Sequence, residues 1–212
     1  MIRKEYQAGQ WQFPFVAYFP DNMTDDLPLI VQLHGAGECG NGYSELYKVD
    51  ANGFSHMLHG PKEYACIFIM PQCDTDSFWV AEIAQLYEFI LKAVKEFSVD
   101  PRRVYLTGLS MGGYGTWYTA MRHPELFAAI APVCGGGMVW NAGVLDMPIW
   151  AFHGTEDSVV YPTETINMIN RIRILKKNNH EVKMTLVDKV GHGVWDVAYQ
   201  EALLEWLLSK TK

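Results

Sequence analysis

The strongest constraint on the fold of this chain is the alternation of short apolar runs with segments of helical period. The runs that predict strands are 11–19, 29–33, 65–70, 104–107, 127–133, 149–152 and 183–187. The segments that predict helices are 79–97, 111–122, about 163–177 and 197–208. This alternation is typical of a mostly parallel sheet covered by helices on both faces. The run 11–19 alternates only loosely and is expected to be an antiparallel edge strand.

The size of the chain favours one domain. With 212 residues, 49% of them apolar, the sequence is long enough for a single well-filled core and shows no internal repeat or low-complexity tract. We therefore expect a single α/β domain over residues 1–212, without a large cap domain.

Charge and hydropathy exclude two classes of partner. The formal net charge of −7 gives no positive field for a phosphate backbone, so nucleic acid is not expected as a partner. No run approaches the roughly 18–20 apolar residues that span a bilayer, so we expect no membrane insertion. The first residues lack an apolar core after their positive charges, which favours a cytoplasmic location. An exported mature chain would look the same, and the sequence is silent on the oligomeric state.

Residues 108–113, Gly-Leu-Ser-Met-Gly-Gly, are the most informative motif. They lie between the strand expected at 104–107 and the helix expected at 111–122, which is the context of a GxSxG nucleophile elbow. A sharp turn there lifts the Ser110 hydroxyl clear of the sheet, and the new helix directs its free N–H groups at the same place. Ser110 is the predicted nucleophile. The alternative is a tight turn whose serine only caps the helix.

A nucleophilic serine needs an imidazole to accept its proton and a carboxylate to orient that imidazole. In this topology they follow the serine in the order acid, then histidine. Asp157 comes shortly after the strand at 149–152 and is the predicted acid, with Glu156 and Asp188 as alternatives. His192 lies between the last strand and the last helix and is the predicted base. We expect His153, at a strand end, to pack beneath the acid loop.

Two backbone N–H groups must stabilise the oxyanion of the tetrahedral intermediate. One is expected from Met111, the residue after the nucleophile. The other is expected from Ala36, with Gly37 as the alternative, because glycines in the loop after the strand at 29–33 let the main chain approach a substrate carbonyl.

The remaining histidines and cysteines do not predict a cofactor. His56 and His59 are three apart and suggest a metal pair, but no further ligand is spaced to complete a site. We expect neither a metal nor an organic cofactor. The four cysteines lack CxxC spacing, so free thiols are expected, although Cys39 and Cys73 both follow predicted strands and could approach one another.

Longer strings add a family resemblance. They are Leu-His-Gly-Ala-Gly-Glu from 33, Pro-Gln-Cys from 71, Asp-Pro from 100 before residues 104–113, Pro-Val-Cys-Gly-Gly from 132, the stretch 150–157, and Gly191-His192 followed by Trp195-Asp196. Over roughly residues 27–208 the chain resembles the α/β-hydrolase superfamily, in particular small lid-less carboxylesterases, also labelled predicted peptidases or phospholipase/carboxylesterase-like. These are related to feruloyl and acetylxylan esterases and to polyhydroxybutyrate depolymerases.

The resemblance implies the same nucleophile, acid and base as the motifs. Two positions depart from the family pattern: Gly193 stands where a polar residue is common, and Tyr161 precedes Pro162 where proline follows the valines directly. Both border the expected pocket and weaken any transfer of substrate preference.

The predicted function is ester hydrolysis through an acyl-enzyme, acting on a small-molecule or oligosaccharide-linked ester such as a feruloyl or acetyl ester of plant polysaccharide. The alternatives are a serine peptidase of short peptides, a thioesterase or lysophospholipase-like hydrolase, and a binding protein with a vestigial triad. Only 47 positions separate Ser110 from Asp157, so the pocket is expected to be open. Trp79, Trp140 and Trp195 are the predicted aromatic wall of that pocket.

Overall fold

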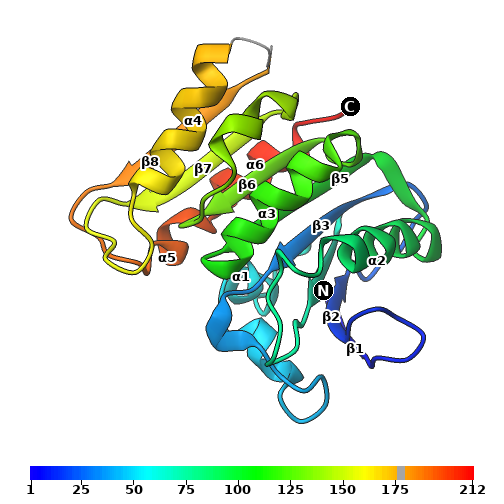
Figure 1. Cartoon of the computed structure of the whole chain (residues 1–212). Coiled ribbons are helices and arrows are strands. Elements are labelled where there is room, and N and C mark those ends of the chain that lie inside the picture. The colour runs from blue at the N-terminus through cyan, green and yellow to red at the C-terminus, as the bar shows by residue number, and fades with distance from the viewer. Residues whose placement is uncertain (176–179) are drawn as a thin grey trace.

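The computed structural model describes residues 1–175 and 180–212, and its centre is a mostly parallel sheet of eight strands in the order β1-β2-β4-β3-β5-β6-β7-β8 (Figure 1). The strands are β1 (Ile2–Tyr6), β2 (Phe15–Phe19), β3 (Leu27–Leu33), β4 (Ile67–Pro71), β5 (Val99–Leu109), β6 (Ala129–Val133), β7 (Ile149–Gly154) and β8 (Val182–Val187). β2 pairs antiparallel with β1 and β4, and all other pairs are parallel. The predicted α/β-hydrolase fold class is confirmed.

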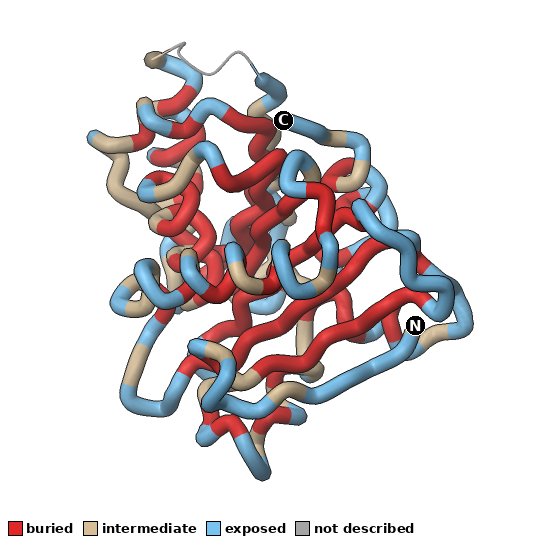
Figure 2. Tube along the Cα trace, turned by 90° about the vertical axis from the view of Figure 1, so that its right-hand side faces the viewer, coloured by how far each residue is buried: buried red, intermediate tan, exposed pale blue. Residues whose placement is uncertain are grey.

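Helices cover both faces of this sheet. They are α1 (Ser55–Leu58), α2 (Ile83–Glu96), α3 (Met111–Arg122), α4 (Thr163–Leu175), α5 (Trp195–Ala198) and α6 (Glu201–Leu208). One apolar cluster packs α2, α3 and α4 on one face, and a second packs α1, α5 and α6 on the other (Figure 1). Figure 2 shows the consequence: the central strands are buried along their length, and the exposed residues lie in the outer loops and helix faces. No helix in residues 1–175 and 180–212 is long and apolar enough to cross a membrane.

The N-terminal region differs from the sequence prediction. The predicted strand at 11–19 begins only at Phe15, directly after Pro14, and it is not the edge. The edge strand is β1, which sequence reasoning missed because its residues are mostly exposed and include the charged side chains of Arg3 and Lys4. A five-residue strand that buries little carries no apolar signal of its own.

The predicted C-terminal helix at 197–208 is two helices. α5 ends at Ala198, and α6 begins at Glu201. Between them Tyr199 has a ψ of 67°, and its fully buried hydroxyl lies 3.1 Å from Oγ1 of Thr107. The predicted helix at 79–97 begins at Ile83, and that at 163–177 is described as far as Leu175, so its last two positions lie outside the described residues.

Candidate active site

Ser110 occupies a strained backbone position between β5 and α3. Its φ and ψ are 55° and −116°, and its N–H donates to the carbonyl of Val133 on β6 at 2.9 Å. Side chains at the flanking glycines are sterically impossible: a Cβ on Gly108 would overlap the carbonyl of Gly112, and one on Gly112 would overlap that of Leu33. The positive φ of a non-glycine residue is therefore imposed by close packing of helix against sheet, as functional sites often show.

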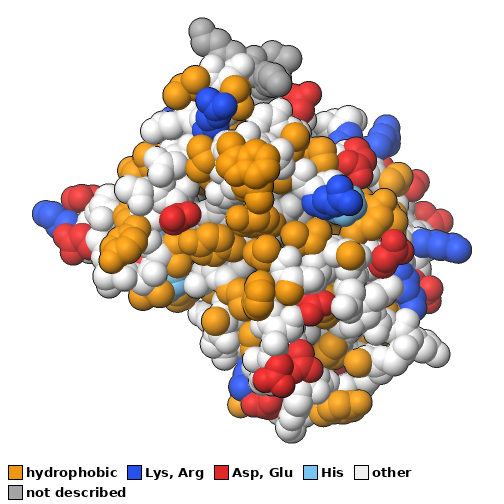
Figure 3. Space-filling view, in the orientation of Figure 1, with side chains coloured by type: hydrophobic (Ala, Val, Ile, Leu, Met, Phe, Trp, Pro, Cys, Tyr) orange, Lys and Arg blue, Asp and Glu red, His pale blue; other side chains and the backbone are white. Residues whose placement is uncertain are grey.

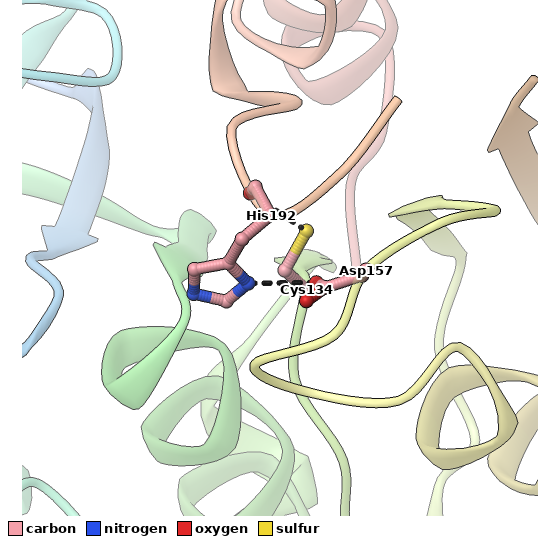
Figure 4. Close-up of side chains that lie close together, drawn as sticks. All are labelled: Cys134, Asp157 and His192. Atoms are coloured by element: carbon pink, nitrogen blue, oxygen red, sulfur yellow. Dashed lines mark hydrogen bonds and ion pairs between the residues drawn. The ribbon is translucent and has the colours of Figure 1, made fainter. Parts of the chain in front are cut away.

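The structure brings His192 and Asp157 to this serine. Nε2 of His192 lies 2.8 Å from Oγ of Ser110, across 82 positions of sequence. Nδ1 of His192 lies 2.7 Å from Oδ2 of Asp157 (Figure 4). Because the carboxylate can only accept, Nδ1 carries the proton and Nε2 is free to accept the serine hydroxyl proton. Ser110, His192 and Asp157 thus form one continuous hydrogen-bonded chain.

The charge of Asp157 is held by its surroundings. Its side chain is buried, and Oδ1 accepts the N–H groups of Val159 and Val160, each at 2.9 Å. Burial by itself would raise the pKa of Asp157, but the hydrogen bonds from His192 and the two N–H groups outweigh burial and hold the pKa below its usual value. Asp157 is therefore an ionised carboxylate at neutral pH. The alternatives Glu156 and Asp188 are exposed loop residues, and neither contacts His192 in the described part of the chain.

The loop after β3 lies directly against the nucleophile. A Cβ on Gly35 would lie 3.5 Å from Cβ of Ser110. Gly35 donates its own N–H to Oε2 of Glu38 at 2.8 Å, and Oε1 of Glu38 accepts from Asn52 at 3.0 Å. Ala36 is the first residue of the 3₁₀ turn Ala36–Glu38, and Met111 is the first residue of α3. The first N–H groups of a helix have no partner within it. The N–H groups of Ala36 and Met111 are thus candidate oxyanion donors, and the catalytic role of each stays a prediction.

His34 fixes the shape of the same loop and was not singled out from the sequence, although it precedes Gly35 in the motif. It is buried, and Nε2 accepts the N–H of Cys73 at 2.9 Å. The proton is therefore on Nδ1, which donates to the carbonyl of Gly35 at 2.6 Å. Burial lowers the pKa of His34 to about 4, so the ring is neutral at physiological pH. Cys39 and Cys73 are free thiols, and burial raises the pKa of both.

Cys134 is a further group at the site that sequence reasoning did not assign. Its Sγ, an oxygen of Asp157 and a nitrogen of His192 all lie within 4.8 Å of one another (Figure 4). Burial raises the pKa of the Cys134 thiol to about 12, and the thiol donates to the carbonyl of His192 at 3.5 Å. A protonated thiol is a poor metal ligand, and N–H donors already occupy both oxygens of Asp157. The cluster fits a hydrogen-bonded network better than a metal centre.

His56 and His59, weighed as a metal pair, contact different partners. Nδ1 of His56 lies 2.8 Å from the carbonyl of Gly53. Nε2 of His59 lies 3.4 Å from the hydroxyl of Tyr18.

The three predicted pocket tryptophans lie in three different environments. Trp79 is fully buried, its Nε1 donates to the carbonyl of His34 at 3.0 Å, and its ring packs edge-on against the imidazole of His34. It belongs to the core and cannot line an open pocket, so this prediction is wrong. Trp195 is half-buried, with its ring edge-on to His192 at a centroid distance of 5.4 Å. Trp140 is 76% exposed.

Exposed apolar side chains also flank the acid loop. Val159 and Tyr161 follow Asp157 and are largely exposed. Figure 3 shows hydrophobic side chains gathered across the middle of the face that α3 and α4 cover, while acidic and basic side chains lie mostly toward its rim.

Comparisons with known proteins agree with this fold. Residues 80–142 match the model of the prolyl oligopeptidase family. The chain is 30% identical over 176 residues to a bifunctional acetylxylan esterase/xylanase of Neocallimastix patriciarum, covering 74% of this chain and 23% of that protein. It is 28% identical over 163 residues to feruloyl esterase B of Piromyces equi, covering 68% of this chain and 29% of that protein. The chain thus spans about a quarter of the length of these curated relatives.

Among solved structures, a thermostable esterase superposes with a TM-score of 0.79 at 29% identity, covering all of this chain and 63% of that one. By its fold and these similarities, the chain belongs to the α/β-hydrolase superfamily.

Proposed function

We propose that this chain is a serine carboxylesterase that cleaves carboxylic esters through an acyl-enzyme. The observation that carries the proposal is the unbroken hydrogen-bonded chain from Oγ of Ser110 through His192 to Asp157. A serine hydroxyl is a weak nucleophile until a base accepts its proton, and here Nε2 of His192 lies within hydrogen-bonding distance of that hydroxyl.

In the first half of the reaction, Oγ of Ser110 attacks the ester carbonyl carbon and its proton passes to Nε2 of His192. The carbonyl oxygen becomes an oxyanion, and the N–H groups of Met111 and Ala36 are its proposed donors. Asp157 holds the imidazolium in orientation and balances its charge. His192 then gives the proton to the alcohol oxygen, the carbon–oxygen bond breaks, and the alcohol leaves.

In the second half, a water molecule attacks the acyl-enzyme while His192 accepts one of its protons. The tetrahedral intermediate collapses, the bond to Oγ breaks, and His192 returns the proton to Ser110. The carboxylic acid leaves and the starting state is restored. The rate should fall on the acid side of the pH profile, because a protonated base cannot accept the serine proton.

The substrate class follows from the relatives rather than from the triad, which cleaves esters and amides alike. Relatives named acetylxylan esterase and feruloyl esterase support acetyl or feruloyl esters of plant polysaccharide as substrates. A second candidate is a peptidase of short peptides, because residues 80–142 match the prolyl oligopeptidase family.

The test compares the parent chain with Ser110→Ala on p-nitrophenyl, feruloyl and acetyl-sugar esters and on a chromogenic peptide. We expect ester cleavage with a loss of at least about 1000-fold in Ser110→Ala, and fluorophosphonate labelling only where Ser110 is present. The matched control is Ser44→Ala, an exposed loop serine that should keep both activity and labelling. Ester cleavage that survives in Ser110→Ala would reject the proposal, and a preference for the peptide would favour the second candidate.

A further inference from the structure

His153 is a second imidazole on the carboxylate of Asp157. It lies near the end of β7. Its side chain is fully buried, and so is the carboxylate of Asp157. Nε2 of His153 lies 3.2 Å from Oδ2 of Asp157 and 2.9 Å from the carbonyl oxygen of Val160. Oδ2 is also the oxygen that accepts Nδ1–H of His192 at 2.7 Å. One carboxylate oxygen therefore lies between two imidazoles.

The hydrogen-bond inventory fixes the proton on Nε2 of His153. A peptide carbonyl only accepts, and an ionised carboxylate only accepts. Both groups that face Nε2 are of this kind, so Nε2 must be the donor. Its hydrogen bond goes to the carbonyl oxygen of Val160 at 2.9 Å, and Oδ2 of Asp157 lies 3.2 Å from the same nitrogen. An acceptor nitrogen at this buried position would face two oxygens without a proton between them, which is strongly unfavourable.

The other side of the ring connects His153 to the helix of the nucleophile. Oγ1 of Thr165, in the first turn of α4, donates its one proton to the carbonyl oxygen of Gly135 at 2.8 Å, and its lone pairs face Nδ1 of His153 at 2.8 Å. Gly135 packs so closely on α3 that a Cβ there would overlap the backbone of Gly113. The ring is thus held between the acid loop, α4 and the segment that supports α3.

We propose that His153 is a positioning residue. Its Nε2–H holds the carbonyl of Val160, whose own N–H is bonded to Oδ1 of Asp157, and so keeps the carboxylate in the orientation that His192 requires, while the ring lies close enough to Oδ2 to offset part of its negative charge. This inference rests on the proposed function of the triad. His153 does not reach the substrate, so it acts only through Asp157.

Two effects follow from removing the Nε2–H donor. The carbonyl of Val160 would lose its partner, which loosens the segment whose N–H holds Oδ1 of Asp157, so His192 would be oriented less well toward Ser110. The carboxylate would also keep more charge for His192, which stabilises the imidazolium and moves the acid limb of the activity profile to higher pH.

Two other titratable side chains near Asp157 do not change charge over the pH range of the experiment. Cys134 and Tyr114 also face Asp157, but burial raises the pKa of both, so they stay protonated between pH 5 and 9. His192 and His153 are the two imidazoles that lie on this carboxylate.

The experiment compares His153→Leu, which removes both ring nitrogens, with His153→Gln, whose amide N–H can replace the Nε2 donor. We expect His153→Leu to lower kcat by about 10- to 100-fold through misplacement of the base, with KM nearly unchanged. We expect its acid limb to move to higher pH and His153→Gln to recover most of both changes. The matched control is His123→Leu, a histidine stacked on Tyr87 at the far end of α3, which should keep parent kinetics.

Thr165→Val provides a second test if His153→Leu does not fold. It keeps the volume but removes the hydroxyl that holds Nδ1, so it should produce a smaller change of the same sign in kcat and in the acid limb. Unchanged profiles in His153→Leu or in Thr165→Val, or an equal kcat loss in the Leu and Gln variants with no movement of the acid limb, would overturn the positioning role. Failure of the proposed function looks different, because the parent would then show no activity that depends on Ser110.

Discussion

The Cα of Gly154, the last residue of β7, lies against the carbonyl oxygen of Gly191, so closely that any side chain on Gly154 would overlap it. Gly154 stands three residues before Asp157, and Gly191 directly precedes His192. The contact sets the spacing between the loop that carries the proposed acid and the loop that carries the proposed base. Contact between two backbone segments, rather than between flexible side chains, therefore sets the distance between the loop of Asp157 and the loop of His192.

Gly154→Ala tests this contact. The added methyl group must push the loop of Gly191 away, so we expect a loss of about 1–3 kcal/mol in the free energy of unfolding and a fall in kcat. Chemical denaturation and ester hydrolysis measure the two effects. Gly191→Ala is the control for stability, since its Cβ would meet only the carbonyl oxygen of Glu156 at 3.8 Å. Equal stability losses in the two variants would contradict the steric explanation.

Trp79→Phe separates a core role from a pocket role. The substitution removes the indole N–H that satisfies the carbonyl of His34, so we expect the protein to lose about 1–3 kcal/mol of stability. Because Trp79 is fully buried, the ratio of kcat/KM for feruloyl and acetyl esters should stay the same. A changed kcat/KM ratio with unchanged stability would indicate that Trp79 does line the substrate pocket.

Trp195→Ala and Trp140→Ala test the remaining aromatic wall. The ring of Trp195 contacts the imidazole of His192 edge-on, so its removal should lower kcat for all esters. Trp140 is exposed and has no such contact with His192 in the described residues, so its removal should lower kcat/KM for feruloyl esters more than for acetyl esters if it stacks on the phenolic ring. Identical kcat/KM ratios in Trp140→Ala and the parent would show that Trp140 does not contribute to binding the feruloyl group.

His34 should make stability depend on pH. In the folded chain its pKa is lowered from 6.5 to about 4 by burial, whereas the unfolded chain binds a proton at the ordinary value. Between these values the unfolded state binds more protons, so stability decreases as the pH falls from about 6.5 to 4, by an amount on the order of 2–3 kcal/mol. Urea denaturation at several pH values measures this decrease. His34→Gln cannot titrate and should be less stable at pH 7 but show a flatter dependence; an equally steep dependence would contradict the assignment.

The sequence predicted most of the fold because its signals are local. The strands that form the core of the sheet are continuous apolar runs, and residues 83–96 carry a clear helical stripe. The edge strand β1 was not predicted because it is short and exposed. The helix break at Tyr199 was not predicted because it depends on a contact with Thr107, which is far away in the sequence.

The candidate site divides in the same way. Ser110, Asp157 and His192 could be nominated because glycine spacing and position at strand ends are readable along the chain, and the structure brings these three together. Trp79 was misplaced because a tryptophan at the start of a predicted helix looks the same in sequence whether its ring turns inward or outward. Only the packing of His34 and α3 around it decides that it is buried.

By itself, the sequence determined the succession of the core strands and of the helices α2, α3 and α4, and the sharp turn at Ser110. Hydrophobic period and the absence of a side chain at glycine act over only a few residues. The tertiary structure alone decided which imidazole contacts which oxygen of Asp157. Hydrogen bonds are made between atoms about 3 Å apart, and chain segments far apart in sequence reach that distance only when the whole core is packed.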